Sequence, residues 1–112
     1  MEMGKSMQLK SKEDAIVWLK KDLTIDRLWD IMEFYEDFPF YTTRDLEFTY
    51  IIKGNEMFVN RKEKSITKAT VGMALRKALV LGGIVPGPKK LGTFGASYIY
   101  PIFLYFEIIR QK

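Results

Sequence analysis

Two apolar series recur at helical spacing in the first third of the chain: Ile16, Leu19 and Leu23, and then Ile25, Leu28, Trp29, Met32 and Tyr35. Ser11 and Thr24 precede the two series, and both are residue types that cap helix starts. The pattern predicts two helices. We expect the second to end near Asp37, because Pro39 disfavours a helical conformation in the residue before it.

Residues 47–53 alternate instead, with Phe48, Tyr50 and Ile52 on one face, which is typical of a strand. Gly54-Asn55 follows, and glycine supplies the positive φ that a type II′ hairpin turn needs. Residues 56–60 are therefore expected to return as the partner strand. Residues 40–44 are expected to form a loop before this hairpin.

A third helix is predicted by the series Val71, Ala74, Leu75, Ala78 and Leu79. Ser65 or Thr67 can cap its start, and Gly82-Gly83 should end it. After it, Ile84-Val85 is expected to form a short strand. Residues 86–96, rich in glycine, proline and lysine, are expected to form a loop.

The segment Tyr98–Ile109 is apolar on nearly all sides, and Ser97 can cap it as a last helix with Pro101 in the first turn. A strand is the alternative, because tyrosine, isoleucine and phenylalanine also favour strands. A helix apolar all round is either fully buried or half-buried in a partner. The second outcome would make the chain a homodimer through this segment.

These elements predict an α+β fold of two N-terminal helices, a β-hairpin, a basic amphipathic helix, a Gly/Lys loop and an apolar C-terminal helix. The length of 112 residues fits one domain, expected over residues 11–112 after a leader of residues 1–10. The leader has no apolar stretch typical of a signal peptide, and the longest apolar run is too short to cross a bilayer. We expect a cytoplasmic protein with no membrane partner.

The chain contains no cysteine and no histidine, which excludes disulfides, thiolate metal sites, a Cys nucleophile and a His base. We therefore expect neither a cofactor nor an enzyme. Asp22, Asp26 and Asp30 are spaced as an acidic row on a helix, for which a solvated face is favoured over a cation site. Asp45 and Glu47 with Lys53 match no spacing typical of a metal-dependent nuclease.

The net charge of +4 is unevenly distributed. Residues 60–90 hold eight lysines and arginines against one acid, Glu63, whereas residues 1–59 hold more acidic than basic residues. Such a division suggests a polyanionic partner for the basic segment. The alternative is that the acidic and basic parts face each other, within the protein or across a dimer.

Within the basic segment, residues 66–94 read ITKATVGMALRKALVLGGIVPGPKKLGTF. This stretch resembles the recognition helix and wing of GntR-type winged-helix regulators through Thr67, Thr70-Val71, Ala74-Leu75, Gly82, Ile84-Val85 and Gly92-Thr93-Phe94. The match needs one inserted residue near Gly83. It also departs from the family upstream, where a charged hairpin region replaces an amphipathic helix, so the fold expected is a winged-helix variant. Residues 87–103 are also similar to small proteins of Gram-positive bacteria, which implies no activity.

The resemblance implies a small regulatory protein that binds double-stranded DNA. The expected contacts come from the helix, the following loop and the preceding charged stretch: Thr67, Lys68, Thr70, Arg76, Lys77, Lys89, Lys90, Arg61, Lys62 and Lys64. The amides at the start of the helix could also meet a phosphate.

Two other functions are open. One is a dimeric protein-interaction module without catalytic activity, whose basic stretch meets an acidic protein surface. The other is a phosphate cradle in the loop 87–97, although the Gly-Lys-Ser/Thr ending of the Walker pattern is missing there.

Overall fold

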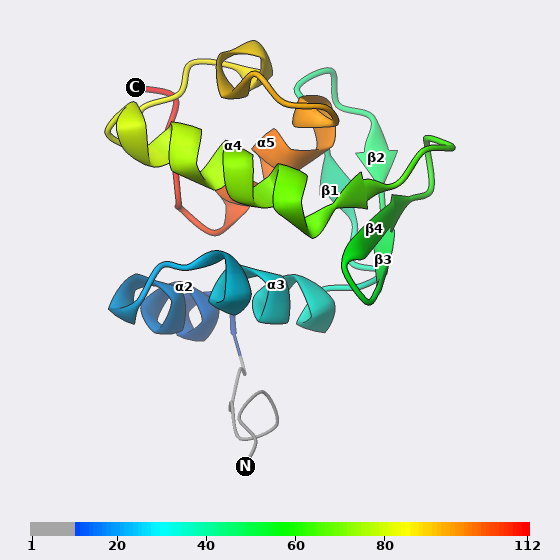
Figure 1. Cartoon of the computed structure of the whole chain (residues 1–112), viewed down its shortest axis with the longest axis horizontal. Helices are drawn as coiled ribbons and strands as arrows, with labels where there is room; N and C mark the ends of the chain where they lie inside the picture. The colour runs from blue at the N-terminus through cyan, green and yellow to red at the C-terminus, as the bar shows by residue number, and fades with distance from the viewer. Residues whose placement is uncertain (1–10) are drawn as a thin grey trace.

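The computed structural model describes residues 11–112, so the predicted leader lies outside the described residues (Figure 1). The elements are, in order, α2 (Lys12–Lys21), α3 (Ile25–Phe34), β1 (Phe40–Tyr41), β2 (Glu47–Phe48), β3 (Tyr50–Lys53), β4 (Glu56–Val59), β5 (Ile66–Thr67), α4 (Lys68–Val80), the 3-10 helix η1 (Pro88–Leu91) and α5 (Ala96–Tyr105). The α+β fold expected from the sequence is confirmed. No helix among residues 11–112 is long and apolar enough to cross a membrane.

Three helix starts are capped as the sequence predicts. The Ser11 hydroxyl accepts from the Asp14 amide at 3.2 Å, and the Thr24 hydroxyl accepts from the Arg27 amide at 3.2 Å. At the third start the cap is Thr67 and not Ser65, whose hydroxyl instead donates to Glu56 at 2.6 Å. Each cap satisfies one of the amides that a helix start leaves without an intrahelical partner.

The second helix ends earlier than expected, at Phe34 instead of near Asp37. Asp37 has a left-handed conformation, with φ at 65°, and its amide donates to the carbonyl of Tyr50 at 2.9 Å. The end of α3 is therefore determined by a hydrogen bond to β3. That bond is not visible in the local sequence.

The predicted hairpin forms between β3 and β4, with Lys53 opposite Glu56 and Gly54 at a φ of 61° between them. The structure contains two strand pairings besides this hairpin. β5 extends the sheet in the order β3-β4-β5, and β1 pairs with β2 in a second, two-stranded sheet. The expectation of a loop over residues 40–44 is wrong at its start, because Phe40 pairs with Phe48 and its ring stacks on those of Phe48 and Tyr50.

α5 forms the centre of the core and lies behind α4 in Figure 1. Its five consecutive residues from Ile99 to Phe103 are buried, and the Tyr100 hydroxyl donates to the carbonyl of Val85 at 2.6 Å. The helix starts earlier than predicted, with Gly95 as its cap instead of Ser97, so Pro101 lies in the second turn. Other parts of the same chain cover most of this apolar segment. Its apolar composition therefore does not require a homodimer.

The region after α4 differs from the expected wing. Gly82 and Gly83 end the helix as predicted, with φ of 71° and 79°. Ile84 then makes only an isolated parallel bridge to Arg110, so the short strand expected at 84–85 does not form. The residues that follow form η1 and the approach to α5 instead of a two-stranded wing.

Leu79 was expected in the core and is 52% exposed. Val71, Ala74 and Ala78 define the buried face of α4, and Leu79 lies on the flank beyond it. A helical period selects candidate core positions, but neighbouring elements decide how wide the covered stripe is.

We predict that Gly95→Ala lowers the free energy of unfolding by about 3 kcal/mol. Gly95 has a φ of 75°, and an added Cβ would clash with the side chain of Ile66, with Cγ1 only 2.7 Å away. Urea denaturation measures the loss. Gly92→Ala is the matched control, since Gly92 has a φ of 67° with nothing within 4 Å of the added Cβ. Equal losses for the two variants would show that the contact with Ile66 does not matter.

We predict that the protein loses stability above about pH 10 through Tyr50. Burial raises the pKa of Tyr50 well above its ordinary value of 10.0, with smaller contributions from Glu36 and Tyr35, and its hydroxyl donates to the carbonyl of Met32 at 2.6 Å. The fold favours the neutral phenol. The stabilisation that the neutral Tyr50 contributes is therefore fully present below pH 10, and it falls as the pH rises towards the folded-state pKa.

Tyr50→Phe should cost about 1 kcal/mol at neutral pH, through the lost hydrogen bond, and should flatten the alkaline decline in chemical denaturation. Tyr105→Phe is the control, because burial raises the pKa of that tyrosine less. A decline that is equally steep in wild type and Tyr50→Phe would contradict the prediction.

Candidate nucleic-acid interface

The cations of residues 60–90 are distributed over two flanks of α4. In Figure 1, the yellow-to-orange segment that contains η1 lies above α4, and α3 lies below it. Lys68 and Arg76 are on the lower flank, where they line a groove with Ile25 of α3. Gly72 lines this groove with Ile25, and Lys77 follows Gly72 by five residues, a rotation of about 140° around the helix axis. Lys77 therefore lies on the opposite flank.

The loop before β5 and the loop after η1 meet on the η1 side. The ammonium group of Lys62 lies 3.9 Å from the ring centroid of Phe94, and that of Lys64 lies 5.7 Å from it. A lysine over an aromatic face is held by the negative charge of that face. Phe94 is itself 48% exposed, so the contact fixes the loop and leaves the lysines at the surface.

Lys89 and Lys90 are exposed on η1, which is anchored by the buried Leu91. We define the basic edge as the six cations on this side of α4: Arg61, Lys62, Lys64, Lys77, Lys89 and Lys90. Within residues 11–112, none of the six forms an ion pair with a carboxylate. Of the ten residues predicted to contact DNA, the structure brings Lys62 and Lys64 together at Phe94, and Lys89 and Lys90 are neighbours on η1.

The other predicted contacts lie elsewhere. Lys68 pairs with Asp26 of α3, with Nζ 2.8 Å from Oδ1. It lines the groove of about 710 Å³ with Thr67 and Arg76, and the carboxylate of Glu56 also faces this space. Because acidic groups stand beside these residues, the lower flank is a weaker site for a polyanion than the basic edge.

Two of the amides at the start of α4 already have partners within the chain. The Lys68 amide donates to the carbonyl of Asn55 at 2.8 Å, and the Thr70 amide donates to the Thr67 hydroxyl at 3.1 Å. The Thr67 hydroxyl in turn donates to that of Thr70 at 3.0 Å. Both threonines predicted to contact DNA are therefore engaged in the helix cap.

The expected acidic row does not form. Asp22 is the residue after α2, whereas Asp26 and Asp30 belong to α3, so the three do not share a helix. Within the described part of the chain, no three acidic side chains come close enough to hold a metal ion.

A second apolar face of α4 was missed in the sequence. Its residues point away from the core, and we call them the outer face: Ala69, Gly72, Met73, Arg76, Leu79 and Val80. Met73 is 53% exposed and Val80 is 81% exposed. The spacing of these residues in the sequence already indicated a second helical face, but the buried stripe alone was sufficient to predict the helix.

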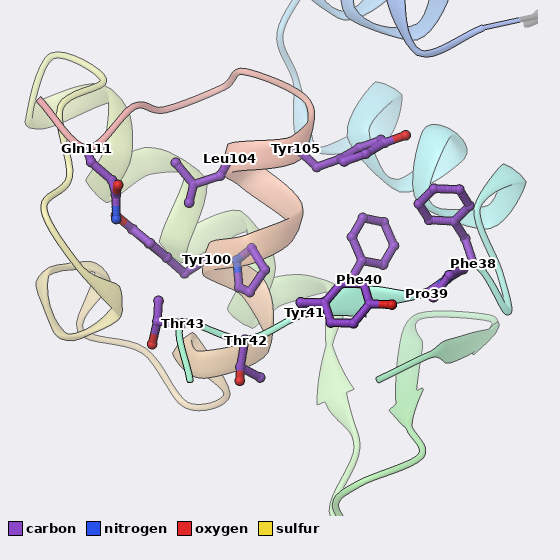
Figure 2. Close-up of a pocket in the computed structure, with 11 residues that line it drawn as sticks. Phe38, Pro39, Phe40, Tyr41, Thr42, Thr43, Tyr100, Leu104, Tyr105 and Gln111 are labelled. Atoms are coloured by element: carbon purple, nitrogen blue, oxygen red, sulfur yellow. The ribbon is translucent and has the colours of Figure 1, made fainter. Parts of the chain in front are cut away.

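An aromatic pocket of about 520 Å³ lies between β1 and α5 (Figure 2). Its lining comes from two distant stretches: Phe38, Pro39, Phe40, Tyr41, Thr42, Thr43, Tyr100, Pro101, Leu104, Tyr105 and Gln111. The lining carries no charged side chain, and its polar groups are hydroxyls and one amide. Sequence reasoning could not find it, because neither stretch is distinctive alone.

Comparison with protein-family models, curated proteins and solved structures finds no match for this chain. The likeness of residues 66–94 to GntR-type regulators therefore rests on the residues quoted for it.

Proposed function

We propose that the protein binds nucleic acid, with double-stranded DNA as the ligand, through the basic edge. The observation that carries the proposal is the set of six cations in the basic edge, five of them exposed and Lys62 half-buried, none of which pairs with a carboxylate within residues 11–112. Phosphate groups are the complementary partners, and their neutralisation releases counterions from the nucleic acid. The remaining predicted residues, Thr67, Lys68, Thr70 and Arg76, do not belong to this surface.

Binding through this edge is mostly independent of base sequence. Five of its six cations are lysines, which act as point charges towards phosphates. Reading of base edges requires hydrogen-bonding side chains on a helix that enters the major groove. The outer face of α4 instead presents Ala69, Met73 and Val80. We therefore favour a backbone-binding regulatory or architectural protein over a regulator that reads a defined site.

The second candidate is a protein-interaction module. One observation favours it, namely the exposed apolar side chains on the outer face of α4, which suit a protein surface better than a nucleic acid.

We predict that a duplex of mixed sequence binds at low salt. The affinity should fall by about two to three orders of magnitude between 50 and 200 mM salt, as expected for about five phosphate contacts. Fluorescence anisotropy of a labelled duplex measures the affinity across the salt series. Absence of binding at 50 mM salt would contradict the proposal.

The matched variants place the site. Lys89→Ala with Lys90→Ala removes two cations of the basic edge and should make the slope of log affinity against log salt shallower by about two. Lys20→Ala with Lys21→Ala removes the same charge from the last turn of α2, outside the basic edge, and should leave the slope nearly unchanged. Equal effects of the two pairs would show that binding responds only to net charge.

A further inference from the structure

The aromatic pocket between β1 and α5 has one wall that belongs to the core. The rings of Phe38, Phe40 and Tyr105 contact one another, with centroids 5.2, 5.3 and 5.4 Å apart in the three pairs. Phe40 is buried, and its ring also stacks on that of Tyr50. This wall is therefore in place before any ligand arrives, as is usual for small-molecule sites.

The loop after β1 is also held in one conformation. The Thr42 hydroxyl accepts hydrogen bonds from the amides of Arg44 and Leu46 at 3.3 and 3.1 Å, and the Thr42 amide donates to the carbonyl of Leu46 at 3.0 Å. Thr43 lies inside this bonded turn. The turn therefore fixes where Thr43 meets the pocket.

One end of the pocket is polar. The Arg110 amide donates to the carbonyl of Gly83 at 2.9 Å, which holds the chain beside Gln111. Figure 2 shows Gln111 and Thr43 on the side of the pocket away from Tyr105. Within residues 11–112, the Gln111 amide group and the Thr43 hydroxyl form no hydrogen bond. Both groups are therefore available to a polar group of a ligand.

The middle of the pocket is apolar and the whole lining is uncharged. Pro101 and Leu104 of α5 contribute apolar groups, and Leu104 lies between Gln111 and Tyr105 in Figure 2. A charged ligand would lose hydration in this pocket, and no side chain of the lining carries an opposite charge to offset the loss. The lining therefore selects an uncharged ligand.

The size of the pocket limits the ligand further. Its volume of about 520 Å³ lies within the range of small-molecule sites. A cavity of about 150 Å³ is large enough for one benzene ring. The pocket can therefore accept two fused rings together with a small polar group.

We propose that this pocket binds an uncharged aromatic small molecule, with its rings at the Phe40 and Tyr105 end and its polar group at Gln111 and Thr43. The lining includes no residue of the basic edge. Its occupation therefore does not depend on the proposed binding of nucleic acid.

Three naphthalene derivatives test the proposal, because they share one ring system and differ in charge. They are naphthamide, which is neutral, naphthoate, which is an anion, and naphthylmethylammonium, which is a cation. In NMR titrations of the backbone amides, we expect saturable shifts with naphthamide and affinity at least about tenfold weaker for either ion. Absence of saturable shifts with naphthamide, or equal affinity for the three compounds, would overturn the proposal.

Thr43→Trp places the site. Thr43 is exposed, so the larger ring should fill the pocket without unfolding the protein, and naphthamide should bind at least about tenfold more weakly. Val80→Trp is the matched control, since valine and threonine are similar in shape and Val80 is 81% exposed outside the pocket. It should bind naphthamide as the wild type does. Unchanged binding by Thr43→Trp, with an unchanged Tm, would show that the pocket is not the site.

Gln111→Lys tests the orientation of the ligand. A cation at the polar end should let naphthoate bind at least about tenfold more tightly than it binds the wild type. Lys89→Ala with Lys90→Ala alters the net charge outside the pocket and should leave the naphthamide affinity unchanged. If Gln111→Lys bound naphthoate no better than the wild type does, the proposed orientation would be wrong.

A proline-rich peptide tests the other class of ligand that aromatic surfaces bind. Such a peptide extends by about 3.1 Å per residue, so its contacts follow a long groove instead of one pocket. We therefore expect that a peptide of about ten prolines does not displace naphthamide. Displacement would assign the pocket to a segment of another protein and contradict the proposal.

Discussion

The burial of α5 is the constraint on which the rest of the structure depends. This helix is apolar on nearly every side, so it can be stable in water only if other elements surround it. α4, η1 and β1 pack against it, and the hydroxyl of Tyr100 reaches the carbonyl of Val85. At its start, Gly95 allows the backbone to pass close to Ile66 of β5, which connects the helix to the sheet.

The central position of α5 explains the form of α4. The buried face of α4 uses small residues, Ala74 and Ala78, so the two helices and η1 fit around one core. Only one stripe of α4 is needed for this packing. Its other apolar residues, among them Met73 and Val80, are exposed and lie outside the core.

The same arrangement separates the cations of the basic segment into two chemically different surfaces. On the η1 side, the lysines form no ion pair with a carboxylate of residues 11–112. On the α3 side, Lys68 is paired with Asp26, and Arg76 lines a groove that Glu56 also lines. A single count of positive charge could not have distinguished these two surfaces.

The sequence by itself determined the features that depend on near neighbours. Ser11 and Thr24 cap their helices because a cap needs only an amide three residues away, and Gly54-Asn55 turns because the turn requires one positive φ. The choice of Thr67 over Ser65 as the third cap was left to the structure. The tertiary structure alone decided where α3 ends, where Pro101 falls in α5 and which flank of α4 each cation joins. It also decided that Phe40 pairs with Phe48 and that Leu79 is exposed. These outcomes depend on which distant segment covers each position, and the periodicity of a single element carries no information about that.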